Sequence, residues 1–183
     1  ISKVIVSTDN KLISQISLDL GAEVIDRPIE LSNDTASTES AISHYLNNCN
    51  NVPENIILLQ VTSPIRPHKS LDLAINQFLE NNYDSLLTIS PTHRFFWRIN
   101  DDKSTYAEYN YQSRPRRQDL TLTNQRFLET GSLYIFSYNH FKKTGNRLGG
   151  KIGYIIWPEE YSLEIDTPLD FKLIELIYKE LYS

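Results

Sequence analysis

The chain has 183 residues and a formal net charge of −5, with 40% hydrophobic and 22% charged residues, a composition ordinary for a globular domain with a full core. No apolar run approaches the ~18 residues of a membrane span, and the acidic balance argues against a nucleic-acid groove. The single cysteine, Cys49, excludes an internal disulfide and suits a reducing compartment. We therefore expect a cytoplasmic protein that binds neither membrane nor nucleic acid.

The first thirty residues predict a strand–helix–strand unit. Lys3–Ser7 is a β-branched run typical of a strand buried on both faces, and Glu23–Ile25 is a second short strand. Between them, Lys11–Leu20 has apolar residues at helical spacing, and Gly21 stands where a helix C-cap would be. Such units build parallel sheets with right-handed crossovers.

The strongest candidate for a central strand is Ile56–Val61, in which five of six residues are apolar. Before it, Asp34 or Ser37 would cap a helix that carries Ala41–Leu46. After it comes the polar, proline-locked segment Thr62–Pro67. Since ligands in open α/β sheets bind beyond the carboxyl ends of strands, this loop is a candidate binding edge, although a plain strand-to-helix connection explains it equally well.

A helix over Leu71–Leu79 and a strand over Ser85–Ile89 continue the alternation, which then breaks in the aromatic segment His93–Tyr111. Two aromatic runs on either side of Asn100–Asp102 predict a β-hairpin or an extended arm. So much aromatic surface needs a cover, which is either a second copy of the chain or the arm's own domain.

A basic segment follows in this acidic chain, with four arginines in thirteen residues: Arg114, Arg116, Arg117 and Arg126. Guanidinium groups match carboxylate and phosphate oxygens bidentately, so we predict an anion site; the alternative is that the arginines are solvated surface charges. The next run, Phe127–Phe136, predicts a strand in which Gly131 permits a close approach of the backbone to a ligand.

The chain ends with a predicted strand over Lys151–Trp157, an acidic segment, and a helix that Thr167 would cap, with Pro168 at its first position. Glu164 and Asp166 stand at positions i and i+2, so in an extended segment their side chains leave the same face. Two such carboxylates repel unless a cation lies between them, which makes the pair a candidate Mg²⁺ site. The alternative makes Asp166 a helix cap and Glu164 a surface charge.

Seven motifs then follow one another along the chain. They are VSTDN (6–10), GAEV with RP (21–28), LLQVTSPIR (58–66), RPRRQD (114–119), ETGSLYIF (129–136), GGK (149–151) and LEIDTPLDF (163–171). Together they resemble the acylneuraminate cytidylyltransferases, or CMP-sialic acid synthetases, a group that includes the enzymes for legionaminic and pseudaminic acid. The resemblance implies an α/β fold with a doubly wound, mostly parallel sheet of the Rossmann-like, nucleotide-diphospho-sugar transferase type. It further implies a single domain over 1–183 with a small β-rich dimerisation extension at about 92–126.

The resemblance also assigns roles by position. The nucleotide-binding residues would be Asp9, Arg27, Gln60, Thr62, Ser63 and Arg66; the residues near the sugar acid would be Arg114, Arg116, Arg117, Gln118, Glu129 and Ser132; and Glu164 and Asp166 would be the catalytic, Mg²⁺-binding pair. The family pair usually reads Asp-x-Asp, so Glu164 is a departure, and Asp166 is the firmer ligand. The basic segment would reach at least partly across a homodimer.

The reaction implied is that of CTP with a nonulosonic acid, giving the CMP-sugar and pyrophosphate. The family opens with a loop of glycine, serine and lysine that cradles the CTP phosphates, and this chain has none. Because it also opens at Ile1, in an apolar run and without a methionine, we expect that N-terminal sequence is missing and that these 183 residues alone are inactive.

Two alternatives remain. Kdo cytidylyltransferases and other sugar nucleotidyltransferases form the first, and the Gly-Asp type loop of the Kdo enzymes differs from Gln60–Ser63 here. The second is a non-catalytic module for sugar-nucleotide binding or dimerisation.

Overall fold

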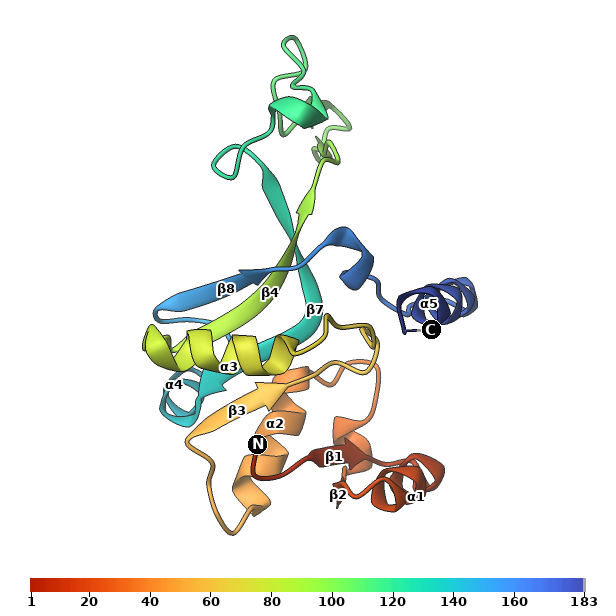
Figure 1. Cartoon of the computed structure of the whole chain (residues 1–183), viewed down its shortest axis with the longest axis vertical. Coiled ribbons are helices and arrows are strands. Elements are labelled where there is room, and N and C mark those ends of the chain that lie inside the picture. The colour runs from red at the N-terminus through yellow and green to blue at the C-terminus, as the bar shows by residue number, and fades with distance from the viewer. Residues whose placement is uncertain (183) are drawn as a thin grey trace. The chain divides into compact units, whose positions relative to one another are not determined.

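The computed structural model describes residues 1–182 (Figure 1). The elements in chain order are β1 (Ile5–Thr8), α1 (Lys11–Asp19), β2 (Glu23–Asp26), α2 (Thr38–Asn48), β3 (Asn55–Leu58), α3 (Ser70–Glu80), β4 (Ser85–Thr92), β5 (Trp97–Ile99), β6 (Thr105–Ala107), β7 (Arg126–Ser137), α4 (Tyr138–Thr144), β8 (Ile152–Ile156) and α5 (Pro168–Tyr182). By compactness the chain divides into two units: unit 1 is Ile1–Ile56 with Phe136–Gly149, and unit 2 is Ile57–Ile135 with the chain from Gly150 onward. No helix within residues 1–182 has the length and apolar character needed to span a bilayer.

Unit 1 begins with the predicted strand–helix–strand unit. Strands β1 and β2 are parallel, with Ile5 opposite Glu23 and Thr8 opposite Asp26. The Asn10 side chain caps α1 by accepting hydrogen bonds from the amides of Leu12 and Ile13 at 2.9 and 3.1 Å. The predicted unit is thereby confirmed.

The predicted burial of this first unit is wrong in two respects. In β1 only Thr8 among the described residues is buried, because β2 is the one strand that pairs with it in the described sheet. None of the described α1 side chains is buried within the structure, and Leu12 is 69% exposed. Within its own unit α1 packs on a two-stranded sheet, which is too narrow to cover an apolar face.

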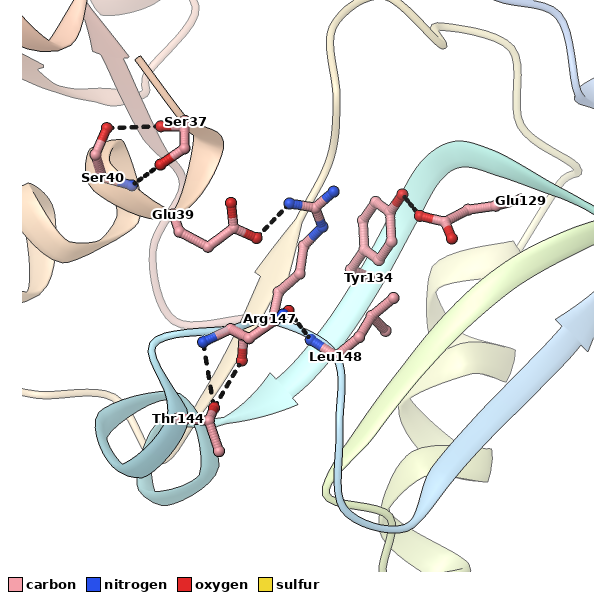
Figure 2. A network of polar contacts seen from close by, with 9 residues as sticks. Ser37, Glu39, Ser40, Glu129, Tyr134, Thr144, Arg147 and Leu148 are labelled. Atoms are coloured by element: carbon pink, nitrogen blue, oxygen red, sulfur yellow. Dashed lines mark hydrogen bonds and ion pairs between the residues drawn. The ribbon is translucent and has the colours of Figure 1, made fainter. Parts of the chain in front are cut away.

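The rest of unit 1 consists of α2 and the segment around α4. Ser37, one of the two predicted caps, accepts a hydrogen bond from the amide of Ser40 at the start of α2. Glu39 of α2 forms an ion pair with Arg147 (Figure 2). Both side chains are largely buried, so this pair ties the loop after α4 to the helix.

The main sheet has the strand order β3-β7-β4-β8. Strands β4 and β8 are parallel, with Ser85 opposite Ile152 and Ile89 opposite Ile156. Strand β3 lies at one end of this order and is shorter than predicted, so its expected central place is wrong. Strand β7 takes a central place instead, because Thr130–Phe136 is buried without interruption, as in a strand covered on both faces.

The core of unit 2 lies between α3 and this sheet (Figure 1). It is formed by Ala74, Phe78, Leu86, Leu133, Ile135 and Trp157. The final helix, α5, begins with the predicted Thr167 cap, which Asp170 extends to a capping box: the amide of Asp170 donates to Oγ1 of Thr167, and the amide of Thr167 donates to Oδ2 of Asp170 at 2.7 Å.

An arm, residues 93–125, connects β4 to β7 and projects from the ends of these two strands (Figure 1). It contains the predicted hairpin, in which β5 and β6 pair antiparallel with Trp97 opposite Ala107. At its base, Glu108 accepts hydrogen bonds from both Arg98 and Arg126, and these two cations lower the pKa of the Glu108 carboxyl. The arm therefore has internal order despite its exposed position.

Candidate functional site

Three segments of unit 2 meet at the middle of β7. The carbonyl of Thr62, in the loop after β3, accepts a hydrogen bond from the amide of Ile165 at 2.8 Å. The Ser63 hydroxyl donates to the carbonyl of Thr130, and the Ser132 hydroxyl donates back to the carbonyl of Ser63, each at 3.2 Å. The loop after β3, strand β7 and the segment before α5 are thus joined by hydrogen bonds.

Gly131 lies at the centre of this junction. Its φ is +66°, a conformation that favours glycine. A Cβ at this position would lie 2.8 Å from Oε1 of Gln60 and 3.3 Å from Oγ of Ser63, and closer still to Oε1 of Glu164. The side-chain oxygens of three residues of the predicted site therefore lie together where a side chain at position 131 would otherwise be.

The carboxylates around Gly131 repel one another. Partial burial raises the pKa of Glu164, and the negative charges of Asp166 and Glu129 raise it further, while a hydrogen bond from Ser63 opposes them. Glu129 accepts a hydrogen bond from the hydroxyl of Tyr134 (Figure 2). Within residues 1–182, no three acidic, histidine or cysteine side chains come together as a metal cluster.

The alternative prediction, that Asp166 caps the final helix, is wrong. Thr167 and Asp170 cap α5, and the Asp166 main-chain amide donates to Oδ2 of Asp170 at 3.2 Å. Among residues 1–182, no hydrogen bond to the Asp166 carboxylate is found, and the residue is exposed. Its charge is therefore available to a ligand.

The guanidinium of Arg66 binds main-chain carbonyls of the protein and not a ligand site. Its Nη2 donates to the carbonyls of Gln60 and Ser132, each at 3.2 Å, and Nη1 donates to the carbonyl of Pro64 at 3.3 Å. Burial lowers the pKa of this guanidinium. Arg66 thus fastens the loop after β3 to strand β7, a role that its type and position alone do not reveal.

The arginines of the basic segment are held separately rather than in one cluster. Arg114 lies over the ring of Phe95 at 4.2 Å from its centroid, and Arg116 binds Asp119 with two hydrogen bonds of 2.7 and 2.9 Å. Arg117 and Gln118 lie in the short 3₁₀ turn Arg117–Asp119 and are exposed. All of these residues belong to the arm.

Asp9 and Arg27 lie in unit 1. They follow the carboxyl ends of the parallel strands β1 and β2, where the amide of Arg27 donates to the carbonyl of Thr8 at 3.0 Å. The Nε of Arg27 is buried without a hydrogen-bond partner among the described residues. The edge that they share is the usual ligand edge of an open α/β sheet.

Hydrogen bonds between two buried threonines next to the site were not predicted from the sequence. The hydroxyls of Thr88 and Thr130 are buried and lie 2.6 Å apart, and Thr130 also donates to the Thr88 carbonyl at 3.2 Å. These bonds join β4 to β7 directly under Gly131. Nothing in the sequence separates two such threonines from ordinary β-branched strand residues.

Comparison with known proteins adds independent findings. A family model described as cytidylyltransferase matches residues 1–180. The chain is 32% identical over 174 residues to N-acylneuraminate cytidylyltransferase A of Danio rerio, covering 93% of this chain and 39% of that protein. It is 26% identical over 190 residues to post-translational flagellin modification protein B of Campylobacter coli, covering 97% and 77% respectively. An N-acylneuraminate cytidylyltransferase of Streptococcus agalactiae is 26% identical over 171 residues, covering 92% and 40%.

The chain spans about two fifths of the length of the Danio rerio and Streptococcus agalactiae relatives. Among solved structures, CMP:2-keto-3-deoxy-manno-octonic acid synthetase complexed with CTP matches with a TM-score of 0.68 at 12% identity, covering 99% of this chain and 82% of that one. A 4-diphosphocytidyl-2C-methyl-D-erythritol synthase from Anaerococcus prevotii matches with a TM-score of 0.63 at 13% identity, covering 100% and 83%. These likenesses confirm the predicted α/β, Rossmann-like nucleotidyltransferase fold.

Proposed function

The chain belongs to the cytidylyltransferase family, and on that premise we propose that it activates a nonulosonic acid with CTP, giving the CMP-sugar and pyrophosphate. The observation that carries the proposal is the convergence of Gln60, Ser63 and Glu164 over the bare backbone of Gly131. Relatives named N-acylneuraminate cytidylyltransferases support the sugar acid as the class of acceptor.

The proposed chemistry is an in-line attack of the anomeric hydroxyl on the α-phosphorus, which needs no nucleophile from the protein. The protein's contribution is positioning and electrostatic stabilisation. Gln60 and Glu164 bring an amide and a carboxylate together beside Gly131, where the absence of a side chain makes room for both, and the buried Ser63 hydroxyl holds the loop to β7. By the family resemblance, Asp9 and Arg27, at the carboxyl edge of β1 and β2 in unit 1, are proposed nucleotide-binding residues.

The acidic pair fits a Mg²⁺ ion. Mg²⁺ is usually bound in proteins by one or two carboxylates, with waters and substrate phosphates as its other ligands. Burial raises the pKa of Glu164 most, and repulsion from Asp166 and Glu129 adds to it; a cation would relieve this repulsion, and the Asp166 carboxylate has no hydrogen bond among residues 1–182. Asp166, with Glu164, would hold the ion, which when bound neutralises phosphate charge and acidifies the attacking hydroxyl.

Recognition of the sugar acid is assigned to the arm and the start of β7. A carboxylate distinguishes nonulosonic acids from neutral sugars, and the guanidinium groups of Arg114, Arg116 and Arg117 are suited to bind it. Gln118 and Glu129 supply further polar groups nearby in the sequence. Ser132, whose hydroxyl is bound to the Ser63 carbonyl, contributes by holding the loop.

The proposal is tested by incubating the full-length gene product with CTP, Mg²⁺ and a panel of sialic-, legionaminic- and pseudaminic-type acids, with Kdo as the alternative acceptor. We expect pyrophosphate release and a CMP-sugar, identified by NMR, with at least one nonulosonic acid. Turnover with Kdo alone would favour the Kdo-type alternative. Binding of CTP without turnover on any acid would favour a non-catalytic module.

A homodimer formed through the arm and a cytoplasmic location are further parts of the proposal. Large side chains of the arm are exposed, including Trp97 at 54% and Tyr111 at 61%, and they line a shallow aromatic groove. Burying such surface stabilises association by about 25 cal/mol per Å² before the costs of association are subtracted. The free Cys49 thiol is in keeping with a reducing compartment.

Replacing Phe96 and Trp97 together with serine is expected to convert the dimer into a monomer, because both rings are exposed on the arm. Light scattering at micromolar concentration measures the change. Leu176→Ser on α5, at a side chain with 63% exposure, is the control and should leave the dimer intact. If the arm carries its arginines into a partner's site, affinity for the sugar acid falls when the dimer is lost. A monomeric wild-type protein would refute the dimer, and a mutant monomer with normal affinity would refute the shared site.

A further inference from the structure

The loop that carries Gln60 and Ser63 is also held from the far end of α5. The hydroxyl of Tyr182 accepts a hydrogen bond from the main-chain amide of Arg66 at 3.2 Å and donates one to the carbonyl of the same residue. A single side-chain group thus satisfies both polar groups of one loop residue. The loop is also held by the Thr62–Ile165 bond, by the guanidinium of Arg66 on Ser132, and by the Ser63–Thr130 and Ser132–Ser63 bonds.

The loop needs such an external partner. Pro64 and Pro67 flank Arg66 and carry no amide hydrogen, so the segment cannot form a regular ladder or a helical turn there. An unpaired amide or carbonyl next to a binding site is free to move or to bind water. Tyr182 supplies from outside the bonds that a neighbouring strand would otherwise supply.

The side chain of Tyr182 is held in its orientation by a neighbouring ring. Its ring packs against that of Tyr178, one helical turn earlier, with the centroids 4.7 Å apart. The helix that carries it is 15 residues long, or about 22 Å, and begins two residues after Asp166. The capping box of Thr167 and Asp170 fixes its first turn. One rigid helix therefore starts beside the acidic pair and reaches the loop with its last turn.

We propose that Tyr182 is a positioning residue of the site, which fixes the loop after β3 through the main chain of Arg66. The hydroxyl touches no substrate; it keeps Gln60 and Ser63 in register with Gly131 and Glu164. The consequence for kinetics rests on the proposed function, whereas the consequence for loop order rests on the geometry alone. Without the hydroxyl, the loop must be ordered when the nucleotide binds, so KM for CTP rises while kcat changes little.

The test compares Tyr182→Phe with Tyr178→Phe in the full-length protein. Both substitutions remove one hydroxyl from the same aromatic pair, and among residues 1–182 no hydrogen bond of the Tyr178 hydroxyl is found. We expect Tyr182→Phe to raise KM for CTP by about three- to tenfold, because the loop loses two hydrogen bonds. The melting temperature should stay near that of the wild type, because both lost bonds are exposed. Tyr178→Phe should change neither.

Hydrogen exchange measured by mass spectrometry on peptides that cover residues 60–66 supplies a readout independent of turnover. Exchange in this loop should be faster in Tyr182→Phe than in Tyr178→Phe and the wild type. Equal exchange and equal KM in the two variants would overturn the proposal. If the wild-type protein makes no CMP-sugar, the proposed function fails, and the exchange comparison by itself still decides the role of Tyr182.

Discussion

Asp166→Asn is expected to reduce Mg²⁺-dependent turnover by about 10²–10³-fold while leaving the melting temperature nearly unchanged. Mg²⁺ chemistry of this kind contributes several kcal/mol to transition-state stabilisation, and each ~1.4 kcal/mol is a factor of ten in rate. The side chain is exposed and its carboxylate has no hydrogen bond among residues 1–182, so the neutral amide should not disturb the fold. Steady-state rates over a Mg²⁺ titration, with thermal unfolding in parallel, measure both effects.

Two neighbouring carboxylates serve as controls for this substitution. Asp170→Asn weakens the cap of α5, where Oδ2 accepts from the amide of Thr167, and should lower stability with a smaller effect on rate. Glu164→Gln should have an intermediate effect on rate, because a glutamate stands here at the first position of a pair that usually reads Asp-x-Asp. Near-normal turnover of Asp166→Asn with unchanged Mg²⁺ dependence would exclude a metal role for this residue.

Gly131→Ala is expected to lower turnover by about 100-fold with only a modest loss of stability. The left-handed φ of +66° costs a non-glycine residue about 1–2 kcal/mol. The new methyl group would also displace the ends of the Gln60 and Glu164 side chains. These ends are flexible, so the structure accommodates them, but a shift of about 1 Å in a catalytic group is enough for such a loss of rate.

Gly145→Ala is the matched control, because Gly145 has nearly the same φ, +67°, and nothing lies within 4 Å of a Cβ placed there. The two variants should lose similar stability in chemical denaturation, and only Gly131→Ala should lose activity. Equal activity in the two variants would show that the space above Gly131 is not part of the site.

Local patterns in the sequence predict much of the fold. The β1–α1–β2 unit, the arm hairpin and the cap of α5 all depend on residues close together in the chain, such as Asn10, Thr167 and Asp170. The place of β3 at the end of the sheet order depends instead on distant pairing, which no local pattern contains. The exposure of α1 has a similar cause, since helical spacing indicates an apolar face but not what lies against it.

The candidate site was predictable in part, and the limit is again distance along the chain. Polar residues after a strand and an i, i+2 acidic pair are visible in the sequence as Gln60, Ser63, Glu164 and Asp166. That Gln60, Ser63 and Glu164 gather around Gly131 depends on contacts between segments about 70 and 100 residues apart in the chain. The contacts of the Arg66 and Tyr182 side chains with the main chain could not be predicted from the sequence for a further reason. Nearly every residue carries a main-chain amide and carbonyl, so the residue type of the partner gives no sign of such a bond.

Strand β7 runs without a break from Arg126, at the base of the arm, through Gly131 to Ser137. Successive residues of a strand face opposite sides, so inserting a single residue between Arg126 and Gly131 would exchange the faces on which every preceding or following side chain lies. The turn at Asn100–Ser104 has no such constraint, because it closes a short exposed hairpin. Length variation among natural versions of this protein should therefore collect at the tip of the arm and be absent from its stem.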